Sequence, residues 1–236
     1  TIESYNSTTG TGIRQSWADG EAVMSTSFPM IYTDVVVTPG VEISPVVLDL
    51  EIDGNVQAGE PNIYTLSLIH FDPQHTVAPM VSRCTLRNSP ADAVSDQSDG
   101  WGIHSFNRMY SNAWHGIHIG FTNSGSVVFG NYANGNGSDG MYFCYGNTNT
   151  RAFGNFFESM PWGFKEVGGQ DDGDALIFGN TTKSITTADY EITSMAQGAV
   201  NIEGILSIGS AGHVVYGDTT RRGRISGVAR NGAGIG

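Results

Sequence analysis

Residues that could carry acid–base chemistry gather in three segments, each built around a glycine that is followed by an apolar residue. The segments are HGIHIG (115–120), DGMYFCYG (139–146) and WGFKEVGG (162–169). Aligning their glycines brings side chains that are distant in the sequence into columns. One column holds His118, Tyr142 and Lys165, with Ser95 in a degenerate earlier copy, and the preceding column holds His115, Asp139 and Trp162.

Two carboxylates in these segments could hydrolyse a glycosidic bond. That reaction needs a pair of carboxyl groups about 5–9.5 Å apart, and Asp139 and Glu166 are the pair we expect to supply them. Strict alternation along a strand points Glu166 inward, so this reading requires a bulge that turns it outward. The alternative for each residue is a solvated strand face, on which polar side chains alternate by necessity.

Elimination or epimerisation at a uronate would use other residues of the same segments. It needs a base for the proton beside the carboxylate, an acid and a cation that neutralises the carboxylate. Lys165 or His118 would serve as the base and Tyr142 as the acid. Arg151 would supply the cation.

The same region holds groups suited to binding a sugar. Aromatic rings pack against the apolar face of a pyranose, while carboxylates and amides hold its hydroxyls. Trp114, Tyr142 and Trp162 would form the platform, and His115 and Asp139 would exchange a hydrogen bond.

An acidic loop follows the third segment. The run GGQDDGDA (168–175) places three carboxylates within four positions, at Asp171, Asp172 and Asp174. Such hard oxygen ligands suit Ca²⁺, although the run matches no known calcium fingerprint and also reads as a solvated turn. Asp171 and Asp174 would alternatively line a substrate groove beside Glu166. No sequence motif indicates any other cofactor.

The elements that must position these groups are short strands in a repeat. Large apolar anchors end five strand-like segments and recur every 20–25 residues, and three are followed by Gly-Asn. The anchors are Leu86, Phe106, Phe129, Phe153 and Phe178. No 3.6-residue apolar period runs through 112–154, whereas Gly, Asn and β-branched residues recur at short intervals, as in strands joined by turns.

This period predicts an all-β fold, a right-handed parallel β-helix in which each repeat is one turn of a coil. The Phe anchors would form an aromatic column inside the coil. The asparagines would stack as a ladder, at Asn88, Asn131, Asn155 and Asn180. The glycine before each Asn would permit a left-handed turn. The alternative is a β-sandwich whose strands resemble one another by accident.

The repeat divides the chain into three parts. Residues 1–45 would form an N-terminal entry rung or cap, residues 46–182 the parallel β-helix, and residues 183–236 an irregular C-terminal cap or an oligomerisation segment. The register of the repeat fades past Thr182, and four arginines lie in the final segment. A tail so poor in large apolar residues would gain stability by burial against sister chains.

The composition of the chain argues against two classes of protein, namely nucleic-acid binders and proteins that span a membrane. The chain has 236 residues, with 11 Lys+Arg against 23 Asp+Glu and a net charge of −12. An acidic surface repels phosphate backbones, so we expect no nucleic-acid partner, and no apolar run approaches the length of a membrane span. Two cysteines, Cys84 and Cys144, are too few for a disulfide scaffold and do not reveal the compartment.

Residues 84–182 resemble the parallel β-helix repeats of the pectate-lyase-like superfamily. The resemblance is carried by Phe129-Gly130-Asn131, Phe153-Gly154-Asn155, Phe178-Gly179-Asn180 and the segment 136–141. The superfamily includes polysaccharide lyases, alginate C5-epimerases and bacteriophage tailspikes. A Gly-rich, Lys-poor coil with an irregular tail looks most like a tailspike fragment, which is usually a homotrimer. The segment HFDPQH (70–75) is similar to the Asp-Pro-His segment of alginate epimerases, with Gln74 inserted.

The resemblance implies a virion-surface or extracellular protein that binds and cleaves a bacterial surface polysaccharide. Two alternatives stay open: a free polysaccharide lyase or uronate C5-epimerase, and a non-catalytic adhesin or structural spike. The substitutions Asp139→Asn and Glu166→Gln would test the hydrolase reading.

Overall fold

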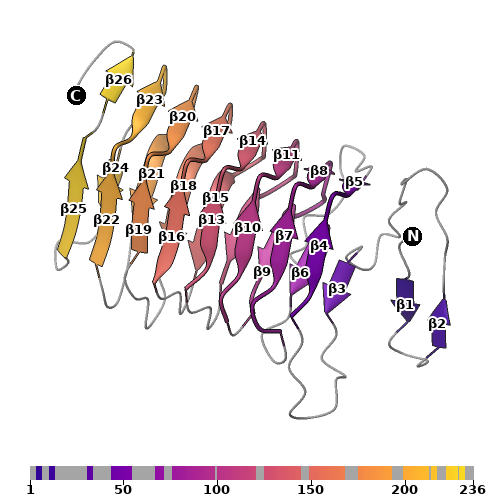
Figure 1. Ribbon diagram of the computed structural model, residues 1–236. Coiled ribbons are helices and arrows are strands. Elements are labelled where there is room, and N and C mark those ends of the chain that lie inside the picture. The colour runs from indigo at the N-terminus through magenta and orange to yellow at the C-terminus, as the bar shows by residue number, and fades with distance from the viewer. Residues whose placement is uncertain are drawn as a thin grey trace.

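The chain folds into a coil of short parallel strands (Figure 1), which a computed structural model describes in part. The described residues are 4–6, 11–13, 31–33, 44–54, 67–71, 76–98, 100–120, 125–144, 149–167, 175–192, 199–212, 214–216, 222–227 and 229–231. They contain no helix. Twenty-four strands form three parallel sheets of eight strands each, which confirms the all-β, parallel solenoid class predicted from the repeat.

The first sheet runs along one side of the coil. Its strands are β4 (Val46–Leu48), β7 (Met80–Ser82), β10 (Ile103–Ser105), β13 (Val127–Phe129), β16 (Thr150–Phe153), β19 (Ala175–Phe178), β22 (Ala199–Glu203) and β25 (Arg222–Ser226).

The second sheet follows the first after a tight turn. Its strands are β5 (Glu51–Asp53), β8 (Thr85–Arg87), β11 (Arg108–Tyr110), β14 (Tyr132–Asn134), β17 (Phe156–Glu158), β20 (Thr181–Lys183), β23 (Leu206–Ile208) and β26 (Ala229–Asn231).

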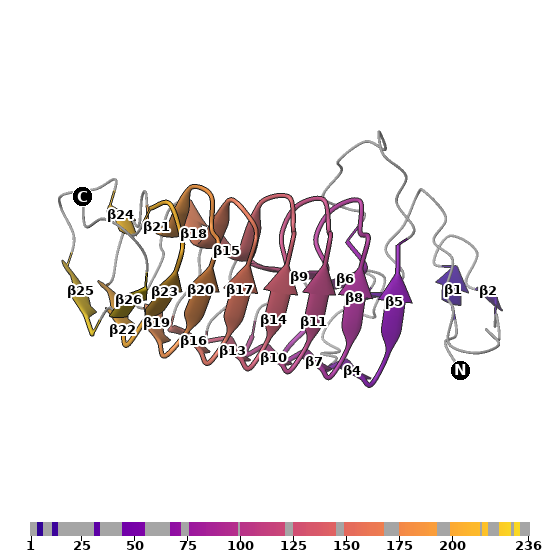
Figure 2. The same cartoon turned by 90° about the horizontal axis from the view of Figure 1, so that it is seen from above.

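The third sheet carries most of the residues singled out above. Its strands are β3 (Ile31–Thr33), β6 (Ile69–Phe71), β9 (Val94–Asp96), β12 (Ile117–Ile119), β15 (Asp139–Cys144), β18 (Trp162–Val167), β21 (Ala188–Ile192) and β24 (Val214–Tyr216). One turn of the coil thus contributes one strand to each sheet, and Figure 2 shows successive turns stacked side by side.

The turn between the first and second sheets explains the repeated Phe-Gly-Asn. Gly130 and Gly154 adopt φ of 65° and 62°, the left-handed region that glycine enters without a steric penalty. The asparagine that follows points inward. Asn107, Asn131, Asn155 and Asn180 form a ladder in which each side-chain Nδ2 donates to the next Oδ1 at 3.0 Å.

The ladder differs from the prediction at one end. Its first member is Asn107, whereas Asn88 donates from Nδ2 to Asp53 Oδ1 at 2.8 Å and lies at the following turn. A second, shorter ladder joins Asn112 to Asn136, with Nδ2 to Oδ1 at 3.1 Å. The buried amides satisfy backbone groups that would otherwise be stranded at the corners of the coil.

The prediction that the Phe anchors line the interior is wrong. Phe106, Phe129, Phe153 and Phe178 do stack in one continuous pile, with ring centroids 4.9–5.2 Å apart. The pile stands on the outer face, however, because Phe106 is 56% exposed and Phe178 is 36% exposed. Alternation places the preceding residue inward, so the residues that fill this side of the core are Val128, Ala152 and Ile177.

The interior is packed with aliphatic and aromatic side chains from all three sheets. The second sheet contributes Leu86, Met109 and Phe157, and the third contributes Ile117 and Met141, each fully buried. His104 is also inside, with Nε2 2.7 Å from the buried Asp96 Oδ2.

Parallel pairing continues beyond residue 182, where the sequence pattern fades. β20 pairs with β23 and β23 with β26, while β22 pairs with β25. The described part of 183–236 therefore extends the coil. Gly204 occupies the turn that Gly130, Gly154 and Gly179 occupy in earlier repeats, and Gly209 occupies the turn that Ser184 occupies one repeat earlier. Near the other end, β1 (Ser4–Asn6) and β2 (Thr11–Ile13) pair antiparallel in a sheet of their own. The cap functions expected for both ends stay predictions.

Candidate functional site

The third sheet aligns the polar side chains on its outer face as the glycine spacing predicted. His118 is in register with Ser95 on one side and with Tyr142 on the other, and Tyr142 is in register with Lys165. Asp139 is likewise in register with Trp162. Residues of four turns therefore form one continuous strip, which we call the histidine face and define as Asp92, Trp114, His115, His118, Asp139, Tyr142, Cys144, Trp162 and Lys165.

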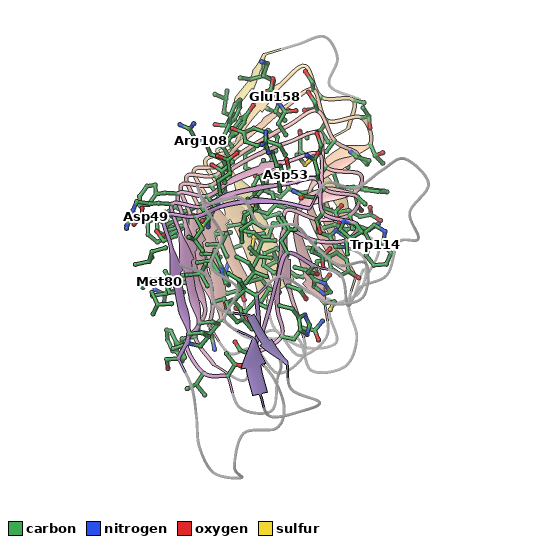
Figure 3. The ribbon with its side chains drawn as sticks, turned by 90° about the vertical axis from the view of Figure 1, so that its right-hand side faces the viewer. Asp49, Asp53, Met80, Arg108, Trp114 and Glu158 are labelled. Carbon is green, nitrogen blue, oxygen red and sulfur yellow. The ribbon has the colours of Figure 1, made fainter. Side chains whose placement is uncertain are left out.

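His115 occupies the centre of the histidine face. Its Nδ1 lies 2.6 Å from Asp139 Oδ2, and its ring stacks on Tyr142 with centroids 4.4 Å apart and planes 5° from parallel. Trp114 packs against the same imidazole at 5.8 Å between centroids and is half-buried. Figure 3 shows Trp114 on the side of the coil opposite Met80 of the first sheet. The His115 imidazole thus contacts both a phenol ring and a carboxylate.

A second imidazole lies beside the first and connects three turns of the coil. His118 Nδ1 lies 3.1 Å from Asp92 Oδ2, and His118 Nε2 lies 2.9 Å from Cys144 Sγ. Asp92 Oδ1 also accepts from the backbone N–H of His115 at 3.2 Å. Asp92 is fully buried, and His118 and Cys144 are 5% and 7% exposed.

Burial and charge act in opposite directions on this pair. Burial alone would lower the pKa of His118, but the hydrogen bonds with Asp92 and Cys144 outweigh burial and raise that pKa to about 10. Burial alone would raise the pKa of Asp92, yet the nearby His115 and the hydrogen bond from His118 hold that pKa below its ordinary value. His118 is therefore an imidazolium and Asp92 a carboxylate at neutral pH.

The turn that contains β18 adds an aromatic ring and a cation to this face. The Lys165 Nζ lies 3.7 Å from the centroid of the Trp162 ring, a cation–π contact. Both side chains are half-buried. They extend the histidine face by one turn beyond Tyr142.

Glu166 does not belong to this face. Its register partners are Phe143 and Ile192, and it is 6% exposed, so it follows the inward side of the strand as strict alternation requires. The predicted pairing of Asp139 with Glu166 as acid and base on one groove is wrong, because no bulge turns Glu166 outward.

Other predicted residues lie elsewhere. Arg151 belongs to β16 of the first sheet, in register with Val127 and Leu176, and so does not face the groove with Lys165. The proposed calcium ligands Asp171, Asp172 and Asp174 lie outside the described residues, as does 72–75 of the epimerase-like segment. Their roles stay predictions.

Sequence reasoning missed Asp92 and Cys144. Asp92 begins the degenerate copy DAVSD (92–96) and occupies the column of His115 one turn earlier, since Val94 is in register with Ile117. Cys144 lies two residues after Tyr142 and therefore on the same face. The column alignment would have placed both, but the contacts that join neighbouring columns are not visible in the sequence.

Within the described ranges, no group of three or more His, Cys, Asp or Glu side chains is arranged to hold a metal ion. The described part of the chain also has no helix long and apolar enough to cross a membrane.

No protein-family model matches the chain, and no curated protein sequence matches it. Among solved structures it is similar to the catalytic domain of a GH87 α-1,3-glucanase in complex with tetrasaccharides, at 13% identity and a TM-score of 0.37, covering 78% of this chain and 54% of that one. The A-module of the Azotobacter vinelandii mannuronan C-5 epimerase AlgE6 is similar at 16% identity and a TM-score of 0.33, covering 80% and 74%. The chain thus spans about half the length of the glucanase domain, and likenesses this distant assign no activity to it.

Proposed function

We propose that the chain binds a bacterial surface polysaccharide along the histidine face and cleaves it there, as part of a virion tailspike or a secreted protein. The observation that carries the proposal is the set of contacts at His115. Its imidazole stacks on the Tyr142 ring with centroids 4.4 Å apart, and its Nδ1 lies 2.6 Å from Asp139 Oδ2. Imidazole, phenol and carboxylate in contact are the groups that move protons near neutral pH.

The geometry favours proton abstraction over hydrolysis. Hydrolysis with two carboxyl groups needs both of them at the sugar, whereas Glu166 faces the core and Asp92 and Asp139 are fully buried against imidazoles. Elimination at a uronate needs one base and one acid on the same face.

His115 and Tyr142 would divide this work between them. Asp139 orients the imidazole through Nδ1, so that Nε2 of His115 would take the proton from the carbon beside the uronate carboxylate. Tyr142 would give its phenolic proton to the glycosidic oxygen as the C–O bond breaks. Lys165 at the next turn would balance the substrate's carboxylate, and Trp114 and Trp162 would pack on the flanking sugar rings.

The test combines three readouts on uronate-containing and neutral polysaccharides. A lyase produces the ultraviolet absorbance of an unsaturated uronate, a hydrolase releases reducing ends without that absorbance, and an adhesin binds glycan while its length stays constant. We expect the absorbance, and we expect Tyr142→Phe to reduce its rate by about 10²–10⁴.

The matched control is Tyr110→Phe on the second sheet, whose ring packs edge-to-face against Tyr132 and lies on a different sheet from the histidine face. It should keep the full rate. Binding without any product would identify an adhesin, and the absence of binding to every glycan would overturn the proposal.

A further inference from the structure

The pair of contacts on His118 suggests a chemistry separate from glycan cleavage. We propose that Cys144 is a nucleophilic thiol, activated by His118 and oriented through Asp92, that accepts an acyl group from a carboxylic ester. The inference does not depend on the proposed glycan cleavage, because that chemistry is assigned to His115 and Tyr142 and gives no catalytic role to Cys144 or Asp92.

The first support is the order of the contacts. A cysteine nucleophile requires a base within hydrogen-bond reach, and the base requires a third group that fixes its orientation. Cys144 Sγ is 2.9 Å from Nε2 of His118, and Asp92 Oδ2 is 3.1 Å from Nδ1 of the same ring. Both ring nitrogens are thus used, one for the sulfur and one for the carboxylate.

The second support is the fold itself. The three residues come from successive turns of the coil, each 26 positions from the next, and parallel pairing of β9, β12 and β15 fixes their separation. His118 and Cys144 therefore lie on strands of the scaffold and Asp92 lies two residues before one, and such positions hold catalytic geometry better than mobile loops do.

The third support is Gly120, which precedes Cys144 by one turn in the same column. A Cβ at this position would lie 2.7 Å from Cys144 Sγ and 3.2 Å from His118 Nε2. Only a residue without a side chain leaves the sulfur and the imidazole room to meet. The space that Gly120 leaves is at the sulfur, where an electrophile would arrive.

The proposed step conserves atoms and charge. In the proposed step the thiol proton has already passed to His118 Nε2, which leaves the imidazolium described above beside a Cys144 thiolate. The thiolate attacks the ester carbonyl carbon, and a C–S bond forms as the C–O bond breaks. The alcohol leaves with the proton from the imidazolium. The neutral imidazole then takes a proton from water as the water attacks the thioester, which releases the carboxylic acid and restores the thiolate and the imidazolium. Each cycle consumes one ester and one water.

The chain contains its own control thiol. Cys84 is 1% exposed, belongs to the packed core, and donates to the backbone carbonyls of Ser82 and Val47 instead of an imidazole. Burial raises the pKa of the Cys84 thiol. Neither cysteine is part of a disulfide, so both can be assayed in one folded molecule without any substitution.

The first experiment treats the folded chain with iodoacetamide and follows each cysteine by peptide mass. We expect Cys144 to be alkylated at least about tenfold faster than Cys84. The titratable side chains that contact His118 of this pair are Asp92, His115 and Tyr142. Asp92→Asn removes the carboxylate that orients His118, so it should slow the alkylation of Cys144 and leave the rate of Cys84 unchanged. Equal rates for the two cysteines would overturn the proposal.

The second experiment uses p-nitrophenyl acetate as the ester. We expect a burst of about one nitrophenolate per chain and one acetyl group on Cys144, and we expect Cys144→Ser and Gly120→Ala to abolish both. Thermal unfolding followed by circular dichroism checks that each variant is folded. Acetylation at other residues alone, or none, would overturn the acyl-transfer step even if alkylation is fast.

Discussion

Two imidazoles and two carboxylates lie within one patch of the third sheet, and the hydrogen bond between His118 and Asp92 makes the protonation of each of these two groups depend on the other. His118 is held charged between Asp92 and Cys144, although burial opposes the charge. Burying a charged pair away from water costs more free energy than holding the same pair at the surface. Such an arrangement ties the stability of the fold to the protonation of His118.

The pH dependence of stability follows from the direction of this shift. The pKa of His118 rises from 6.5 in an unfolded chain to about 10 in the fold, so the stabilisation is complete below pH 6.5 and is lost as the pH rises toward 10. We expect the free energy of unfolding in urea to fall with a slope of up to about 1.4 kcal/mol per pH unit across that window.

His118→Asn provides the comparison, because it removes the titrating group and keeps a polar side chain. The variant's stability should change much less between pH 7 and pH 9, so the difference between the two chains should shrink as the pH rises. If the free energies of unfolding of the two chains, plotted against pH, gave parallel curves, His118 would not titrate as described.

At the scale of single residues, the sequence predicted alignments better than contacts. The column of His118, Tyr142 and Lys165 followed from counting along the repeat, because parallel strands keep a constant register. The contacts of Asp92 and Cys144 with His118 run diagonally between columns. They depend on side-chain rotamers, which no spacing in the sequence encodes.

At the scale of strands, the repeat identified the fold but misplaced its aromatic anchors by one residue. A large apolar side chain was assigned to the interior, whereas Phe129 and Phe153 end their strands on the outer face and stack there at 5.2 Å. The inward positions beside them hold small residues such as Val128 and Ala152. Alternation has a period of two, so an error of one residue exchanges the two faces.

The corrected placement changes which phenylalanine the fold needs. Phe157 is fully buried in β17, whereas Phe153 of the same turn is half-buried on the outer stack. We expect Phe157→Ala to destabilise the coil by about 3–5 kcal/mol and Phe153→Ala by less than about 2 kcal/mol. Urea unfolding of the two variants at one pH would measure the difference. Equal losses of stability in the two variants would show that Phe153 contributes to the core as much as Phe157 does.

At the scale of the whole molecule, the two long faces of the coil beside the histidine face have opposite characters. The second sheet is covered by charged pairs, among them Lys183–Glu158 at 2.7 Å and Arg87–Asp53 at 3.0 Å. The first sheet exposes apolar side chains instead, including Val46 at 59% and Leu48 at 38%. Exposed apolar strips of this kind mark association surfaces.

The homotrimer expected from the tailspike resemblance would use this apolar face, and its mass in solution is the direct test. Light scattering should report a mass close to three times that of the 25.1 kDa chain. Sister chains that each bury the first sheet would shield the Phe stack from water, as a stable interface requires.

The substitution Phe153→Lys would then place a charge in the interface, and we expect that variant to dissociate into monomers. Thr181→Lys adds the same charge to the second sheet, whose outer face already carries ion pairs, and should leave the trimer intact. A monomeric mass for the unaltered chain would show that the apolar face serves another partner or none.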